Sequence, residues 1–132
     1  MPSATQLNLQ LESRTGVLAK LCRDLATGGV NLLALAAPEA DSGRGVVRLL
    51  VANPEQARNA LGKAGYTFVA EEVLFVELKN RPGALAKAVE KLARAKIGIR
   101  YAYATASSRT RTTGAVIAVA DADLPRAMQL LK

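Results

Sequence analysis

Two short stretches of this sequence each combine a strand end, a glycine turn and a helix start. Residues 13–20 read SRTGVLAK and residues 80–87 read NRPGALAK, 67 positions further along the chain. Glycine admits backbone conformations that other residues avoid, and it lets a ligand approach the main chain closely. The start of the following helix offers unpaired N–H groups and a partial positive charge, which suit a carboxylate. Each turn is therefore a candidate binding site for a carboxylate.

The candidate ligand-binding residues are those of the two turns and one asparagine further along. The set is Ser13, Arg14, Thr15, Gly16, Val17, Leu18, Asn31, Asn80, Arg81, Pro82, Gly83, Ala84 and Leu85. The predicted donors are the backbone amides around Gly16 to Leu18 and the matching amides around Gly83 to Leu85. Strand carbonyls or Asn31 would accept from an ammonium group. A second interpretation stays open for each turn, namely that glycine is there because the turn is tight.

Several side chains of this set have two possible roles. Thr15 stands where the second turn has Pro82, and its hydroxyl can cap the helix or touch a ligand. Arg14 and Arg81 can face solvent or contact a bound carboxylate, and we favour solvent. Asn31 can contact a ligand or complete a strand end, and we favour the strand end. Which of the two turns binds a ligand stays open.

The residues that the chain lacks argue against catalysis. There is no histidine, so the usual general base and imidazole metal ligation are missing. The single Cys22 can form neither an internal disulfide nor a paired thiolate zinc site. We therefore expect no catalytic residues, no metal site, no cofactor and no enzymatic activity.

Length and composition indicate a compact globular protein. The 132 residues are 50% hydrophobic and 22% charged, enough for one ordinary domain or two small ones. The apolar runs are broken by charged residues well short of a membrane span. Residues 1–11 have neither a basic segment nor a long apolar run typical of a secretory signal. We expect a cytoplasmic protein.

The elements around the turns repeat as well. Shifting the sequence by 67 positions places the alternating residues Leu7, Leu9 and Leu11 on Leu74, Val76 and Leu78. This alternation predicts a strand before each turn, and the apolar spacing after it predicts a helix whose end is marked by glycine. Further strands are expected from residues 30 and 46 and from residues 97 and 115. Helices then start at Asn53 and at residues 121–125, with an Asn or Asp cap.

The resulting order, β-α-β-β-α-β given twice, is the ferredoxin-like plan of the α+β class. It predicts two antiparallel sheets, each with two helices on one face, in domains at residues 1–70 and 71–132. Residues 66–78 must supply both the last strand of the first domain and the first strand of the second. The second domain lacks an obvious last strand, which another segment or another chain could supply.

With the turns placed in this plan, the chain resembles the ACT domain family, specifically small stand-alone proteins of two tandem ACT domains. Residues 80–85 match the turn pattern [DN]-x-P-G-x-L fully and residues 13–18 match it in part. Residues 29–32, GVNL, resemble the G-[IV]-N-[IV] start of the second strand. The resemblance implies a regulatory protein that binds a free amino acid, or a similar small carboxylate, where two domains meet. It also implies a homodimer.

Two other functions remain as alternatives. Val73 and Phe75 lie on the strand face opposite Leu74, so that sheet is expected to be apolar on both sides and to need a cover. This favours a subunit that dimerises or docks on a metabolic enzyme without a ligand. The net charge of +7, with Arg109 and Arg111 close together, would suit nucleic acid. We rank nucleic acid last because the predicted third strands carry no aromatic residues for base stacking.

Overall fold

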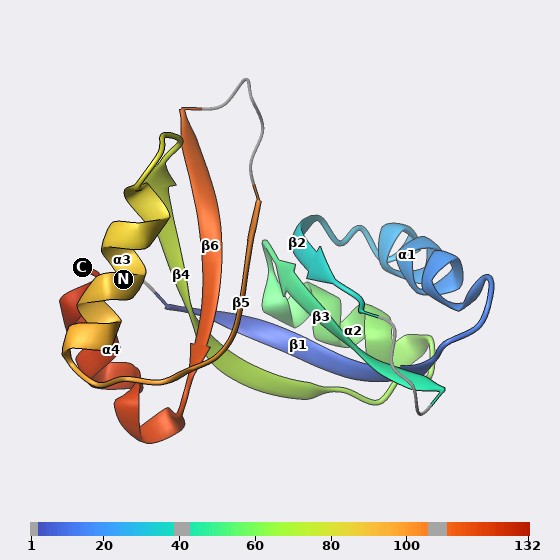
Figure 1. The fold of residues 1–132 in the computed structure, drawn as a ribbon. Helices are drawn as coiled ribbons and strands as arrows, with labels where there is room; N and C mark the ends of the chain where they lie inside the picture. Colours follow the sequence, from blue (N-terminus) through green and yellow to red (C-terminus); the bar gives the residue numbers. More distant parts are fainter. Residues whose placement is uncertain (1–2, 39–42, 106–110) are drawn as a thin grey trace. The chain divides into compact units, whose positions relative to one another are not determined.

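The protein is described here by a computed structural model, which covers residues 3–38, 43–105 and 111–132 (Figure 1). Its elements in chain order are β1 (Ser3–Glu12), α1 (Val17–Thr27), β2 (Leu32–Ala36), β3 (Arg44–Val51), α2 (Pro54–Lys63), β4 (Val69–Lys79), α3 (Ala84–Arg94), β5 (Ile99–Thr105), β6 (Thr112–Val119), a short 3₁₀ helix (Asp121–Asp123) and α4 (Leu124–Leu130). They form two compact units, which we call the first unit (Thr5–Glu71) and the second unit (Glu72–Lys132 with residues 3–4). Arg109 lies outside the described residues.

The first unit packs α1 and α2 against a sheet in which β3 lies between β2 and β1. Leu7 stands opposite Leu49 and Leu9 opposite Val47, so the alternating residues of both strands share one face. That face meets the apolar stripe of the two helices. The buried core consists of Leu7, Leu9, Leu21, Leu25, Val47, Leu49, Val51, Ala57 and Leu61. The predicted alternation and helical spacing are confirmed.

The second unit repeats this arrangement with α3, α4 and a sheet in which β6 lies between β5 and β4. Figure 1 shows α3 and α4 beside each other on one face of these strands. Leu74 stands opposite Ile117 in the antiparallel pair of β4 and β6. Its core consists of Leu74, Val76, Ala88, Leu92, Ile97, Ile117, Val119, Ala127 and Leu131. The α+β fold of two ferredoxin-like repeats is therefore confirmed.

β1 and β4 each contribute residues to both units. β4 is one continuous strand, as the double use of this segment predicted, and residues 69–71 belong to the first unit. Residues 3–4, at the start of β1, belong to the second unit. Because β1 neighbours β4 in the strand order, the start of β1 takes the place of the missing last strand in the second unit. The domain boundary between residues 70 and 71 stays a prediction.

The two glycine turns have nearly the same geometry. Gly16 has φ +90° and Gly83 has φ +87°, in the left-handed region, and each is the N-cap of its helix. The N–H of Lys20 donates to the Gly16 carbonyl at 3.0 Å, and the N–H of Lys87 donates to the Gly83 carbonyl at 3.0 Å. Left-handed backbone costs a residue with a Cβ about 1–2 kcal/mol. The tight turn thus accounts for both glycines, so the glycines alone do not indicate a ligand-binding site.

One of the predicted helix ends is confirmed, and two others differ from the prediction. The Asn53 side chain accepts a bond from the Gln56 N–H at 3.2 Å, which confirms the predicted cap of α2. The predicted Asp cap of α4 is wrong, because the 3₁₀ helix precedes α4 and Asp123 makes no side-chain capping bond. After α3, the left-handed residue is Lys96, with φ +58°, rather than Gly98.

The sheet of the second unit is apolar on both faces, as predicted. Val73 is completely buried on the side of β4 that faces away from α3 and α4. Phe75 pairs with Val116 in β6, and Val116 is 1% exposed although it lies on that same face. Val73 and Val116 are thus shielded from solvent, as expected for an apolar sheet face that needs a cover.

Candidate ligand-binding site

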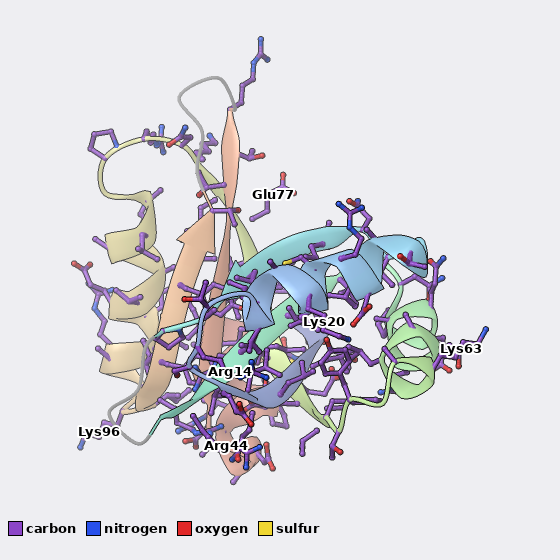
Figure 2. All side chains as sticks on the ribbon, turned by 90° about the vertical axis from the view of Figure 1, so that its right-hand side faces the viewer. Arg14, Lys20, Arg44, Lys63, Glu77 and Lys96 are labelled. Carbon is purple, nitrogen blue, oxygen red and sulfur yellow. The ribbon has the colours of Figure 1, made fainter. Side chains whose placement is uncertain are left out.

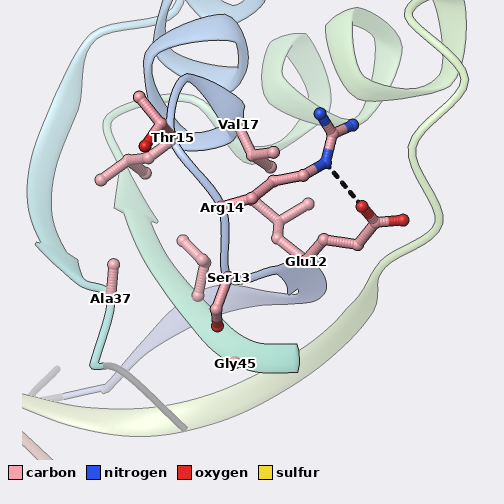
Figure 3. Close-up of a pocket in the computed structure, with 10 residues that line it drawn as sticks. Glu12, Ser13, Arg14, Thr15, Val17, Ala37 and Gly45 are labelled. Carbon is pink, nitrogen blue, oxygen red and sulfur yellow. Dashed lines mark hydrogen bonds and ion pairs between the residues drawn. The ribbon is translucent and has the colours of Figure 1, made fainter. Parts of the chain in front are cut away.

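The first glycine turn lies beside a pocket of about 350 Å³ within the first unit (Figure 3). The pocket is bounded by the end of β1, the start of α1 and the first half of β3. Its apolar walls are Leu11, Val17, Leu18, Ala37 and Val47. Its polar lining is Glu12, Ser13, Arg14 and Thr15. The structure thus brings together five residues of the predicted set, residues 13–15 with Val17 and Leu18, at a cavity large enough for a small ligand.

The polar lining contains a pair of opposite charges. Arg14 Nε donates to Glu12 Oε2 at 2.6 Å, and both side chains are more than half exposed. The hydrogen bond and the charge of Arg14 hold the pKa of Glu12 below its ordinary value of 4.5, and the charge of Arg44 adds a smaller effect. Both arginines are labelled in Figure 2. The pocket therefore offers a carboxylate and a guanidinium side by side at neutral pH.

Backbone donors at the start of α1 extend this arrangement. The N–H of Val17 is already used, because it donates to the Arg14 carbonyl at 3.3 Å. Within the described residues, the N–H groups of Leu18 and Ala19 have no backbone acceptor, and no side chain caps the helix. The capping role considered for Thr15 is therefore not observed. Of the predicted donors at Gly16 to Leu18, the N–H of Val17 is thus already used within the turn, and donation by the others to a ligand stays a prediction.

Gly45 has no side chain, which allows Pro38 and Ser13 to lie close to it at the pocket. A Cβ on Gly45 would lie 2.7 Å from the Pro38 carbonyl oxygen and 3.7 Å from Ser13 Oγ. The Ser13 N–H also donates to the Gly43 carbonyl at 2.8 Å, which ties the turn to the start of β3. The end of β1 and the start of β3 are thereby held together at the pocket.

The second turn has the same backbone but different neighbours. The N–H of Ala84 donates to the Arg81 carbonyl at 3.3 Å, as Val17 does to Arg14 in the first turn. Asn80 takes the place of Ser13, and its N–H donates to the Arg111 carbonyl at 2.8 Å. The position that corresponds to Glu12 is Lys79, so a carboxylate is replaced by a second cation. Ligand binding at Asn80, Arg81, Pro82, Gly83, Ala84 and Leu85 stays a prediction.

Asn31 does not line the pocket at the first turn. Its side chain is exposed just before β2, and its carbonyl accepts from the Ala52 N–H at 3.1 Å. This backbone bond fits the role at a strand end that we favoured. A ligand contact by Asn31 stays a prediction.

The sequence did not single out Leu11, Glu12, Ala37, Gly45 or Val47 as pocket residues. Glu12 had one available signal, since it precedes the turn and lies two residues from Arg14. Gly45 and Val47 reach the pocket through the pairing of β1 with β3, in which Leu11 stands opposite Gly45, and Ala37 reaches it through the pairing of β2 with β3. Only the strand register brings them to the turn.

The described part of the chain shows no metal-binding group of three or more His, Cys, Asp or Glu side chains. Nor does it contain a helix of the length and apolar character required to cross a bilayer.

The fold and pocket together define a tandem of ferredoxin-like units with a ligand-sized cavity at a glycine turn. Residues 3–124 match the ACT domain pair family, and the chain belongs to it. Protein BT0572 from Bacteroides thetaiotaomicron has a similar structure, with 28% identity and a TM-score of 0.86 over 98% of this chain and 87% of that one.

More distant structures share the fold. The regulatory subunits of aspartate kinase from Thermus thermophilus and Thermus flavus are 17% and 16% identical, each with a TM-score of 0.67. In both cases the match covers 99% of this chain and 91% of the other. No curated protein sequence matches the chain.

Proposed function

We propose that this chain is a non-catalytic regulatory protein that binds a free amino acid at the first glycine turn. The observation that carries the proposal is the Glu12–Arg14 pair in the lining of a pocket that also has apolar walls. A free amino acid carries a carboxylate and an ammonium group on the same carbon. A pocket that presents a cation and an anion next to each other is complementary to this pair of charges.

When the ligand binds, the Glu12–Arg14 ion pair opens and each of the two side chains contacts the ligand instead. Its carboxylate contacts Arg14 and the N–H groups of Leu18 and Ala19 at the start of α1, where the helix dipole favours negative charge. Its ammonium group contacts Glu12. Because the Glu12–Arg14 pair is exposed, water and salt screen it, and opening it costs little.

The first turn suits a zwitterion better than the second. Glu12 and Arg14 carry opposite charges, whereas Lys79 and Arg81 at the same positions are both cations. An ammonium group next to Lys79 would meet repulsion instead of attraction. The proposal therefore assigns amino-acid binding to the first turn.

Membership of the ACT domain pair family and the fold shared with regulatory subunits of aspartate kinase support a regulatory role. Binding regulates by favouring one arrangement of domains or chains over another. The proposed assembly is a cytoplasmic homodimer in which the ligand is enclosed at a domain interface. A metabolic enzyme is the proposed partner.

A thermal-unfolding screen against the twenty amino acids, followed by calorimetric titration, tests the proposal. An amino acid that binds the folded state raises the unfolding midpoint. The variant Glu12→Gln should lose about tenfold or more in affinity, as expected for a charge-assisted bond, while the matched Lys79→Gln should bind like the wild type. No shift with any amino acid at millimolar concentration would reject ligand binding.

An interaction subunit without a ligand is the alternative, and it also has a structural observation behind it. β2 and β5 lie at the ends of the strand order, and they carry the exposed Leu33 and Ile99. An edge strand with exposed apolar residues can pair with another chain. If the amino-acid screen fails, a concentration series by analytical ultracentrifugation and a search for an enzyme partner would follow.

A further inference from the structure

We infer that the amino acid bound at the first turn has an aliphatic side chain, such as that of valine, leucine or isoleucine. This inference rests on the proposed function and adds the class of ligand to it. The pocket is divided into a polar part and an apolar part.

The apolar part of the pocket is continuous with the core of the first unit. Val47 belongs to the core and is 5% exposed, and Leu11 packs against that core from the end of β1. Val17, the first residue of α1, lines the same pocket and is half-buried. A ligand side chain placed here meets branched hydrocarbon on several sides and extends the core outward.

In the proposed complex, the two charged side chains of the pocket contact the carboxylate and ammonium groups of the ligand. Among the described lining residues, Glu12 and Arg14 are the charged ones, and they bind each other at 2.6 Å. The other polar residues, Ser13 and Thr15, belong to the turn itself. Among the described residues that line the pocket, no third charged side chain is present to pair with an ionised ligand side chain. A charged side chain next to Leu11 and Val47 would lose water without a partner, which is strongly unfavourable.

These walls predict a rank order of ligands. Each CH₂ group removed from water strengthens binding by about fourfold. Leucine, isoleucine and valine should therefore bind more tightly than alanine, and alanine more tightly than glycine. Leucine has three more carbon atoms than alanine and should bind on the order of 50-fold more tightly if all three are buried. Lysine and aspartate should bind more weakly than alanine.

Calorimetric titration with glycine, alanine, valine, leucine, threonine, lysine and aspartate tests this order. The expected result is an affinity that rises with aliphatic size and depends on Glu12. If lysine, threonine or aspartate binds more tightly than leucine and still depends on Glu12, the aliphatic assignment is wrong while the proposed function stands. If none of the seven and no other amino acid binds, the proposed function falls and this inference falls with it.

Two variants locate the ligand side chain at these walls. Val17→Thr keeps the shape of the wall but adds a hydroxyl, so it should weaken leucine binding several-fold more than it weakens glycine binding. Val30→Thr is the matched control, because Val30 packs against the same core but does not line the pocket. Equal losses for leucine in both variants would contradict the assignment.

A third variant should shift the binding preference from leucine toward lysine. Ala37 is exposed and lines the pocket (Figure 3), so a larger residue can be placed there without disturbing the core. Ala37→Asp should weaken leucine binding and strengthen lysine binding about two- to fivefold, because it adds a partner charge at an exposed position. Thermal unfolding without ligand checks that the variant is folded. Unchanged leucine and lysine affinities would place the ligand side chain elsewhere and overturn the inference.

Discussion

Arg14 Nε donates to Glu12 Oε2 at 2.6 Å, while the second turn has Arg81 and Lys79 at these positions. The two turns share their backbone geometry, so this exchange of a carboxylate for a cation is a chemical difference between otherwise similar sites. Both turns have glycine in the left-handed conformation, and the charges beside it differ.

The same glycine substitution should separate folding from binding at the two turns. Gly16→Val and Gly83→Val both force a β-branched residue to φ near +90°, at a cost of about 1–3 kcal/mol in unfolding free energy. We expect similar losses of stability but loss of amino-acid binding in Gly16→Val alone, with the oligomeric state largely intact. Chemical denaturation and calorimetry measure the two effects. Unchanged affinity in both variants would reject the role of the turns.

Tyr66 should stabilise the first unit over a defined range of pH. Its hydroxyl donates to Asp24 Oδ2 at 2.8 Å, and Lys20 donates to the same oxygen at 2.8 Å. Bonds from Lys20 and then Tyr66 lower the pKa of Asp24 from 3.8, while burial and then the bond to Asp24 raise the pKa of Tyr66 from 10.0. Tyr66→Phe should therefore lower the unfolding midpoint near neutral pH.

The stability that the Tyr66–Asp24 hydrogen bond contributes should depend on pH. The lowered pKa of Asp24 gives stability that is present above 3.8 and is lost as the pH falls through its value in the folded protein. The raised pKa of Tyr66 gives stability that is present below 10.0 and is lost as the pH rises through its folded value. The effect of Tyr66→Phe should be constant between about pH 5 and 9 and shrink outside this range. A constant effect down to pH 2 would contradict this account.

The same lysine-to-glutamate substitution should have opposite effects on the unfolding free energy in α1 and α3. Lys20 forms an ion pair with Asp24 four residues on, whereas Lys87 has Lys91 at the corresponding position. Lys87→Glu replaces repulsion by attraction and places a negative charge near a helix start, which should raise the unfolding free energy by about 0.5 kcal/mol. Lys20→Glu breaks the existing pair and should lower stability. Denaturation at low and high salt tests both signs, and the two effects should diminish at high salt.

Lys96 marks a position where glycine would stabilise the second unit. It has φ +58° after α3, and the matching residue after α1 is Gly29, with φ +73°. Lys96→Gly should raise the unfolding free energy by about 1 kcal/mol, because it removes the steric cost of left-handed backbone. Gly29→Ala should have the opposite effect. A destabilised Lys96→Gly variant would show that the lysine side chain has a role of its own.

Much of the fold could be predicted because it depends on local patterns. Alternation at Leu7 and Leu9, helical spacing after each turn and the Asn53 cap each express a local preference of the backbone. The Asp cap before α4 and a glycine at the end of α3 were also local predictions, and the structure differs from both. A capping preference is worth only about 1 kcal/mol, so it does not by itself determine where a helix begins or ends.

The sequence by itself determined the repeat, the α+β class and the left-handed conformation of Gly16 and Gly83, because these depend on residue type and short-range spacing. Only the tertiary structure decided which residues surround the first turn. Ala37 and Val47 reach Glu12 and Arg14 through the pairing of three strands, and that register depends on how the whole core packs. The assignment of the start of β1 to the second unit likewise follows from long-range strand pairing.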